Sequence, residues 1–353
     1  MMPAPIVVPP SQDWDGNDGP WSSFTLQVGT PAQDVKVIIS TAGDQTWVVL
    51  HQGCTASDPA NCGALRGGEF FPNQSTTWVL NNGSSHGYFD LALKANLGYF
   101  GNGEYGYDTV TLGWQGSGGP SLQQQVVAGI ATKEFYLGLF GINPSPSNFS
   151  SFNDPVPSYM TTLKDRSMIP SLSWSYTAGN QYRFNKVLGS LTLGGYDTSR
   201  FIPNDVSFSF NEENVRDLTV NIESITMTAG GANTTLMSTS IAAFVDSTVA
   251  YMYLPLDVCE SFERAFSISW NSSVQAYLVN DTLHTNLVGQ NANVTFTLGN
   301  STIGYAVDIT LPYAAFDLIA EYPLMPNSTR YFPLMRATND TQYTLGRTFL
   351  QEA

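Results

Sequence analysis

The most constraining feature of the sequence is a strand–turn–strand pattern that occurs twice. In residues 35–49, a run rich in Val and Ile leads into a turn of small residues that begins at Ser40, and a second apolar run follows. In residues 241–254, a similar run leads into a short polar segment that begins at Asp246. Short apolar runs bounded by small polar residues indicate buried strands. The chain therefore places one hydroxyl, Ser40, and one carboxyl, Asp246, at the ends of two buried strands.

The rest of the pattern favours an all-β fold class. From residue 23 onward, short apolar runs alternate with Gly, Asn, Ser and Pro, and Asn102-Gly103 predicts a hairpin turn. Helical spacing predicts surface helices at 155–167 and 255–266, the second with a start that resembles a capping box. We expect strands from there to the end of the chain.

The first 22 residues are rich in Pro, Asp and Gly, and we expect them to form an irregular lead-in. Residues 13–19 have the composition of a calcium loop. However, the glycine is misplaced for the EF-hand pattern and no glutamate closes the loop. We therefore expect a cluster of turns there and no metal site.

Several segments carry a resemblance to a known family. Residues 24–33, which contain Gly29-Thr30-Pro31, together with the turn at Ser40, resemble the first lobe of pepsin-like aspartic proteases. Residues 245–248 resemble the motif of the second lobe in that family. Further matching segments are 138–141, 189–197 and 343–346.

The resemblance implies a secreted, fungal-type member with a mostly β, bilobal fold and a few short helices. It implies a lead-in at 1–22, an N-terminal lobe with a flap at 23–175 and a C-terminal lobe at 176–353. It also implies that the closing strands of the fold lie beyond Ala353.

The same resemblance implies a damaged catalytic dyad. The family places an aspartate in each lobe, and here the first position holds Ser40 while the second holds Asp246. The hydroxyls next to each position are retained, whereas larger residues replace the family's two glycines. These supporting residues are Thr41, Ala42, Ser247 and Thr248. We expect Ser40 and Asp246 to face each other across a central cleft, and the added side chains to narrow the water site or move the backbone.

The chemistry of the dyad explains why Ser40 matters. Aspartic proteolysis needs two close carboxylates that share one proton, because two like charges at that distance cannot both ionise. A hydroxyl cannot act as a general base at acid pH. Asp44 is the nearest other carboxylate on the outgoing side, and we expect it to point elsewhere. The leading hypothesis is therefore a pseudo-protease that binds a peptide or another ligand in the cleft.

Three alternatives stay open. The chain could be a weak acid endopeptidase that uses Asp246 and a water held by Ser40. It could be an enzyme of different chemistry that uses the cleft for a small molecule. It could also be a wall or extracellular binding protein, comparable to plant pepsin-like proteins that inhibit glycosidases.

The family's flap is a hairpin that closes over the cleft and carries a tyrosine. In this chain, Tyr99 is the nearest candidate for that residue, and packing of its ring on the sheet is an equal alternative.

Two of the three cysteines, Cys54 and Cys62, bracket a short polar loop and predict a disulfide. A pair at this place is common in the family. Cys259 is left over, and it is expected either to be a buried free thiol or to pair with a cysteine beyond Ala353.

Secretion is predicted from the number of N-x-S/T sequons, which are acceptors for N-linked glycans. The first residues lack a basic and an apolar region, so we expect a signal peptide to have been removed. The sequon asparagines are Asn73, Asn82, Asn148, Asn233, Asn271, Asn280, Asn293, Asn300, Asn327 and Asn339.

Composition excludes several other functions. The net charge of −15 opposes binding to nucleic acid and to anionic membranes. No apolar run is long enough for a membrane span. The three histidines lie in polar stretches without a nucleophile motif, and no phosphate-binding loop or zinc motif is present. We expect a monomer without a cofactor.

Overall fold

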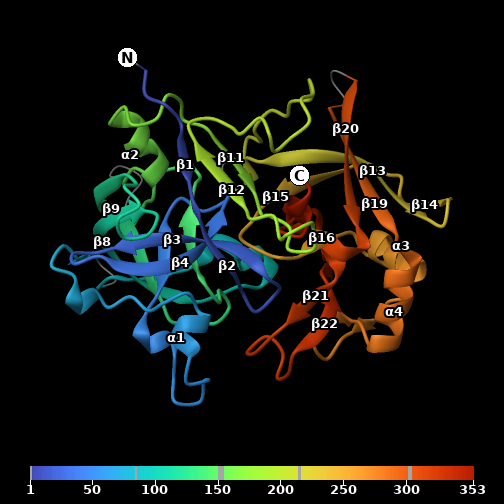
Figure 1. Cartoon of the computed structure of the whole chain (residues 1–353), viewed down its shortest axis with the longest axis horizontal. Helices are drawn as coiled ribbons and strands as arrows, with labels where there is room; N and C mark the ends of the chain where they lie inside the picture. Colours follow the sequence, from blue (N-terminus) through green and yellow to red (C-terminus); the bar gives the residue numbers. More distant parts are fainter. Residues whose placement is uncertain (1, 84–85, 150–154, 214–215, 301–303) are drawn as a thin grey trace. The chain divides into compact units, whose positions relative to one another are not determined.

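The computed structural model describes residues 2–83, 86–149, 155–213, 216–300 and 304–353. The chain divides into two compact units (Figure 1). Unit 1 comprises Met1–Gly16, Trp21–Tyr176 and Leu188–Asp197, and unit 2 comprises Asn17–Pro20, Thr177–Val187 and Thr198–Ala353. Both units are built mainly from strands, which confirms the predicted all-β class.

The main sheet of unit 1 has nine strands, and β7 pairs with β8 beside the principal path. The strands β3 and β8 also pair with each other, so the path curls back on itself. In sheet order the strands are β2 (Pro10–Asp15), β3 (Trp21–Val28), β4 (Gln33–Ser40), β10 (Gly138–Gly141), β5 (Thr46–Val49), β9 (Ser121–Ile130), β8 (Asn102–Leu112) and β6 (Val79–Leu80), with β7 (Tyr88–Asp90) at the side.

A second, three-stranded sheet corrects the prediction for the N-terminus. It has the order β1 (Ile6–Val8), β12 (Ser190–Leu193), β11 (Trp174–Thr177). The first 22 residues are therefore not irregular, because β1 pairs with β12 and β2 pairs with β3. Their backbone groups are satisfied by distant strands, which local composition does not reveal. The segment Leu188–Asp197, which the sequence suggested for the second lobe, is grouped with unit 1.

The helices of unit 1 are short, and the core lies between its two sheets and α2. The predicted helix at 155–167 is present as α2, where Ser158 accepts a hydrogen bond from the Thr161 amide at the N-cap. Met160 and Leu163 of this helix are fully buried in the core. The helices are η1 (His51–Gly53), α1 (Cys62–Leu65), η2 (Pro72–Gln74), η3 (Ala92–Leu97) and α2 (Tyr159–Asp165).

The predicted hairpin turn at Asn102-Gly103 is wrong. Both residues lie inside β8, where Asn102 is opposite Asp90 and Gly103 is opposite Phe89 of β7. The connection between the two strands contains the 3₁₀ helix η3. The dipeptide is compatible with a strand here because its partner strand supplies the hydrogen bonds.

Unit 2 contains an eight-stranded and a four-stranded sheet. The larger sheet has the order β20 (Tyr305–Pro312), β19 (Asn293–Asn300), β13 (Thr219–Ala229), β15 (Ile241–Val245), β24 (Thr344–Leu345), β16 (Met252–Leu254) and β23 (Leu334–Arg336), and β14 (Ala232–Met237) pairs with β13. The smaller sheet has the order β17 (Trp270–Asn271), β18 (Ala276–Leu278), β22 (Thr329–Phe332) and β21 (Leu318–Ala320).

The helices of unit 2 confirm one prediction and correct two. The expected amphipathic helix is α3 (Leu256–Phe266), which buries Val258, Phe262 and Phe266. Its N-cap is Pro255, which makes no side-chain cap, so the expected capping box is absent. The sequence missed α4 (Asp281–Gln290), whose cap is Asn280. Among the described residues, further helical turns are η5 (Tyr313–Phe316), η6 (Asp340–Gln342) and η7 (Phe349–Gln351).

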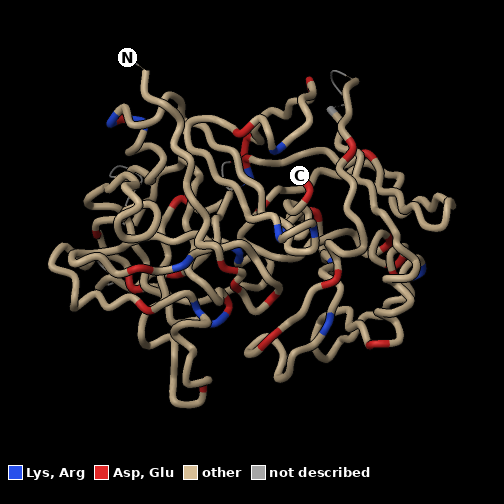
Figure 2. The backbone as a smooth tube through the Cα atoms, in the orientation of Figure 1, with Lys and Arg blue, Asp and Glu red and all other residues tan. Residues whose placement is uncertain are grey.

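Acidic residues outnumber basic ones along the chain (Figure 2), with 29 Asp and Glu against 14 Lys and Arg. Within the described parts of the chain, no helix is both long and apolar enough to cross a bilayer.

Candidate functional site

The first candidate half-site is the turn after β4 in unit 1. β10 runs parallel to β4 and places Gly141 opposite Ser40. The Ile142 amide donates to the Ser40 carbonyl at 3.0 Å, and the Asn143 amide donates to the Gly43 carbonyl at 2.9 Å. A Cβ atom on Gly141 would lie 2.4 Å from the Gly43 carbonyl oxygen, so this close approach requires glycine. The turn is thus held by main-chain bonds from the segment that follows β10.

The side chain of Ser40 is buried and engaged. Its Oγ accepts a hydrogen bond from the Gly43 amide at 2.8 Å, and the residue is 0% exposed. A Cβ atom on Gly43 would lie 2.8 Å from Ser40 Oγ and 3.5 Å from Leu93 Cδ2. The hydroxyl therefore helps to close its own turn, with an apolar side chain from η3 nearby. Thr41 is also buried, and Ala42 is half-buried.

The second candidate half-site is the turn after β15 in unit 2, and it repeats the framework of the first. β24 runs parallel to β15, with Val245 opposite Leu345. The Asp246 amide donates to the Leu345 carbonyl at 3.0 Å. A Cβ atom on Gly346 would lie 2.2 Å from the Tyr251 carbonyl oxygen. Here too a glycine at the end of the parallel strand, one residue beyond β24, permits the close approach of two backbones.

The carboxylate of Asp246 is fixed by its own turn. Its Oδ1 accepts a hydrogen bond from the Thr248 amide at 2.9 Å, and the residue is 0% exposed. Ser247 and Thr248 are buried as well. The Arg347 guanidinium donates to the carbonyls of Ser247 and Thr248, both at 2.9 Å, and to Asp18 Oδ2 at 2.7 Å. No sequence motif had singled out Arg347.

A matching protein family is found for nearly the whole chain. The family described as Eukaryotic aspartyl protease matches residues 23–353. The chain belongs to this family. It is 26% identical over 343 residues to Secreted aspartic protease 8 of Candida albicans, an alignment that covers 96% of this chain and 73% of the relative. It is 24% identical over 255 residues to Candidapepsin-1 of Candida albicans, with 71% of this chain and 59% of the relative covered.

A solved structure supports the same fold. The crystal structure of an aspartic proteinase from Irpex lacteus matches with a TM-score of 0.62 at 16% identity, and covers 99% of this chain and 92% of the other. The fold is therefore the mostly β, bilobal fold of the pepsin-like proteases, with few short helices. The predicted fold class and family are confirmed.

Ala42 and Thr248, which the resemblance aligns with glycines of the family, both have a backbone φ outside the left-handed region. Residues of the described chain with a left-handed φ include nine that are not glycine, and neither Ala42 nor Thr248 is among them. That their side chains narrow the water site or move the backbone stays a prediction.

The carboxyl group of Asp44 is hydrogen-bonded to Ser147. Asp44 Oδ2 accepts a hydrogen bond from Ser147 Oγ at 2.6 Å. Burial raises the pKa of Asp44, and the Ser147 hydrogen bond partly offsets this effect. Ser147 is itself buried and had not been identified from the sequence.

The region expected to hold the flap is formed by β7, η3 and β8. Tyr99 follows η3, and its ring lies 5.7 Å from the ring of Phe135. Tyr105 on β8 is almost fully buried, and its hydroxyl donates to Gln45 Oε1 at 3.1 Å. Trp47 Nε1 donates to the same oxygen. Tyr105 thus connects β8 with the segment after the Ser40 turn, and its place in a Tyr-Gly-Tyr run had suggested only a strand. A flap role for Tyr99 stays a prediction.

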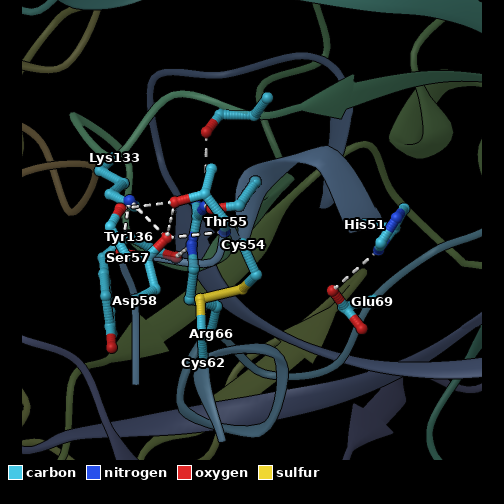
Figure 3. Close-up of a disulfide and its surroundings, with 12 residues drawn as sticks. His51, Cys54, Thr55, Ser57, Asp58, Cys62, Arg66, Glu69, Lys133 and Tyr136 are labelled. Carbon is cyan, nitrogen blue, oxygen red and sulfur yellow. Dashed lines mark hydrogen bonds and ion pairs between the residues drawn. A yellow bond between two sulfur atoms is a disulfide. The ribbon is translucent and has the colours of Figure 1, made fainter. Parts of the chain in front are cut away.

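The predicted disulfide between Cys54 and Cys62 is present (Figure 3), with the Cα atoms 5.8 Å apart. Arg66, just after α1, is fully buried and donates to carbonyls of two other segments. Asp58, inside the disulfide loop, forms an ion pair with Lys133 at 2.6 Å. These contacts attach the loop to the segment after β9. Cys259 is a buried free thiol in unit 2, and burial raises its pKa to about 12.

Two of the three histidines lie beside a carboxyl group. His51 lies 3.8 Å from Glu69 and His284 lies 3.3 Å from Asp317. In residues 13–19, whose composition is that of a calcium loop, Asp13 and Asp15 both form ion pairs with Lys36. Within the described chain, no group of three or more His, Cys, Asp or Glu residues is placed to hold a metal ion.

The sequon asparagines lie at the surface. Nine of them are exposed, while the side chain of Asn300 lies outside the described part of the structure. Asn280 and Asn339 also cap helical turns through their side-chain oxygens. The exposed asparagines are Asn73, Asn82, Asn148, Asn233, Asn271, Asn280, Asn293, Asn327 and Asn339.

Proposed function

We propose that this chain is a secreted aspartyl protease homologue that binds an extended peptide and does not hydrolyse it. The observation that carries the proposal is the position of Ser40. It ends β4 beside the parallel strand β10, as Asp246 follows β15 beside the parallel strand β24. In each unit, the residue where the buried strand gives way to the turn is thus the candidate catalytic position, and unit 1 carries a hydroxyl there.

The chemistry of peptide hydrolysis supports this reading. One carboxylate must take a proton from water while the other donates a proton to the substrate carbonyl, so both are needed. Ser40 Oγ accepts the Gly43 amide hydrogen bond and cannot become a base at acid pH. Asp44, the nearest carboxyl group in sequence, is bonded to Ser147. Loss of one member of an acid–base pair typically costs ~10²–10⁴-fold in rate.

The retained groups fit binding. Asp246 keeps a fixed carboxylate that can accept a hydrogen bond from a peptide amide or from a hydroxyl, and a charged acceptor makes the stronger hydrogen bonds. We place the peptide in the cleft that the family resemblance implies, with Asp246 as its polar anchor. Ser247 and Thr248 flank Asp246 in its own turn, and Ser40, Thr41 and Ala42 form the equivalent turn of unit 1.

Secretion is part of the proposal. The name of one relative, Secreted aspartic protease 8 of Candida albicans, describes a secreted protein. The sequons support the same location, because nine of their asparagines are exposed and accessible to an N-linked glycan.

Binding can be tested by calorimetry with a peptide that carries a hydroxyl in place of the scissile carbonyl. We expect the unmodified chain to bind this peptide. Asp246→Asn should raise the dissociation constant by about tenfold or more, because a lost hydrogen bond to a charged group costs that much binding free energy. Asp257→Asn is the matched control, because Asp257 is an exposed carboxyl group in the same unit. Binding that is absent, or equal in the unmodified chain and Asp246→Asn, would refute a ligand site at Asp246.

A further inference from the structure

We infer that Arg347 is a positioning residue for Asp246, and that Asp18 is the counter-ion that allows Arg347 to be buried. The inference rests on the proposed function only in taking Asp246 as the ligand-binding group. Arg347 directly follows Gly346, at the end of the segment that begins with β24. It is 4% exposed, so its charge is removed from water.

The hydrogen bonds of Arg347 act on one particular peptide group. Its NH1 atom donates to the Ser247 carbonyl, and the Thr248 amide donates to Asp246 Oδ1. The Ser247 carbonyl and the Thr248 amide belong to the same peptide unit. In a planar trans peptide, the C=O and N–H bonds point in opposite directions. By holding the oxygen, Arg347 keeps the N–H directed at the Asp246 carboxylate.

A second bond strengthens this restraint. The same NH1 atom donates to the Thr248 carbonyl at 2.9 Å, which fixes the next peptide unit. Two successive carbonyls therefore converge on one end of a planar guanidinium, a geometry that suits arginine better than lysine. The Arg347 amide also donates to the Val249 carbonyl at 2.8 Å, so the backbone of Arg347 is tied to the same turn.

The buried charge needs a partner, because moving an ion out of water is costly unless it is paired and hydrogen-bonded. Asp18 supplies that partner with a 2.7 Å contact to the other terminal nitrogen of Arg347. The backbone around Asp18 is itself held in unit 2. The Tyr331 hydroxyl donates to the Asp18 carbonyl at 2.6 Å, and the Glu321 amide donates to the Asn17 carbonyl at 2.7 Å.

Asp18 thereby receives a role that its local sequence did not suggest. In the segment with the composition of a calcium loop, Asp13 and Asp15 bind Lys36, whereas Asp18 binds Arg347. The corresponding position of the other turn shows that an arginine is not required for the framework. There the residue after Gly141 is Ile142, an apolar residue that contacts the Ser40 turn through its backbone amide. Of the two turns, the one with a carboxylate, at Asp246, has the arginine, and the one with a hydroxyl, at Ser40, has an isoleucine in the same place.

Hydrogen exchange of the intact chain without ligand tests this role. In Arg347→Met, we expect the peptide that contains the Thr248 amide to exchange about tenfold faster, as loss of hydrogen bonds to a charged group would produce. Exchange in β13 and β19 of the same unit should stay unchanged. Arg347→Lys should give an intermediate result, because it keeps the charge and loses the fork. Arg336→Met is the control, since Arg336 pairs with Glu263 of α3.

Ligand binding provides the readout that a merely structural role would not move. Arg347→Met should weaken binding of the hydroxyl-containing peptide by about tenfold. In an Asp246→Asn background, Arg347→Met should change the dissociation constant little further, because the carboxylate that Arg347 positions is then already absent. If Arg347→Met fails to fold, Asp18→Asn serves instead and should accelerate exchange at the turn more than in β13.

The outcomes separate this inference from the proposed function. Faster exchange confined to the turn supports the role of Arg347 even if the chain binds no peptide. Unchanged exchange at Thr248 in a folded Arg347→Met variant would overturn the inference. Equal acceleration throughout unit 2, with equal binding losses in both Asp246 backgrounds, would overturn it as well, because those results describe general destabilisation.

Discussion

The turn after β4 and the turn after β15 share a backbone framework but differ in the side chains that complete it. Each lies beside a parallel strand. Each also needs a glycine, because a Cβ atom on Gly141 or Gly346 would lie 2.4 Å or 2.2 Å from a backbone oxygen. In unit 1 the Ser40 hydroxyl accepts a hydrogen bond from the Gly43 amide inside the turn. In unit 2 the acceptor is the Asp246 carboxylate, and a buried arginine braces the turn.

The difference teaches that the framework does not depend on the carboxylate. The bonds that hold the strand ends are main-chain bonds, and they form with either Ser40 or Asp246 at the critical position. A hydroxyl and a carboxylate can both accept an amide hydrogen bond, so a fold of this type tolerates the exchange. Only the acid–base chemistry requires two carboxylates.

The largest expected effect comes from adding a carboxyl group to the first turn and a glycine to both turns. Ser40→Asp combined with Ala42→Gly and Thr248→Gly should raise casein cleavage at pH 4 by about 10²-fold or more over background, because it restores the missing acid–base group and the room for water. Ser40→Asp alone should recover little. The casein cleavage rates of Ser40→Asp and of the triple variant are compared. The triple variant that also carries Asp246→Asn is the inactive control. Full activity from Ser40→Asp alone would show that side-chain volume at 42 and 248 does not limit catalysis.

The glycines should respond alike in both turns. Gly141→Ala and Gly346→Ala should each lower the free energy of unfolding by about 1–3 kcal/mol, because the added methyl would meet a backbone oxygen that cannot move easily. Gly289→Ala in α4 is the control, since nothing lies within 4 Å of its methyl position and alanine favours a helix. Chemical denaturation measures all three. If only one of the two substitutions lowered the free energy of unfolding, the two turns would not share the same requirement for glycine.

The cysteines give a similar contrast between the units. Replacing Cys54 and Cys62 by serine should lower the free energy of unfolding by about 2 kcal/mol, because the bridge closes a short loop with a sequence separation of 8. Cys259→Ala serves as the buried control without a bridge. Thiol titration at pH 8 should find no reactive thiol in the native chain, since burial raises the pKa of Cys259 to about 12, and one after unfolding. Three thiols after unfolding would contradict the disulfide.

The smallest effect concerns Asp44. Because burial raises the pKa of this carboxyl group, its ionisation opposes folding, and the stability present below the unfolded pKa of about 3.9 is lost as pH rises through the higher folded value. Asp44→Asn should therefore increase the free energy of unfolding at pH 7 and change it little at pH 3. Denaturation curves at both pH values, with exposed Asp257→Asn for comparison, measure this. A gain of equal size at both pH values would exclude the ionisation as its cause.

The sequence allowed the local parts of this account to be predicted. The two strand-turn patterns, the helix α3 and the disulfide follow from apolar spacing and from a short polar loop between cysteines. Non-local pairing could not be predicted: β1 looks irregular until β12 provides its partner. The helix α4 was missed because it buries only Leu287 and contains Thr and Asn, which are poor helix formers.

The candidate site shows the same limit. Ser40 and Asp246 stand in recognisable motifs, so their positions at strand ends were predictable. Arg347 was not, because an arginine after an apolar run is normally expected at the surface. Its burial depends on Asp18, which lies 329 residues away in the sequence. The only local signal was its place directly after Gly346, in a segment equivalent to the one that ends at Gly141.

The most direct test of the central claim is whether the unmodified chain cuts a peptide. Denatured casein is incubated with the purified chain between about pH 3 and 6, the range in which a carboxylate pair would share a proton, and the fragments are measured by mass spectrometry. The account predicts the same fragments and rates for the unmodified chain and for Asp246→Asn, both at background. Cleavage by the unmodified chain that disappears in Asp246→Asn would contradict it and identify a working acid endopeptidase.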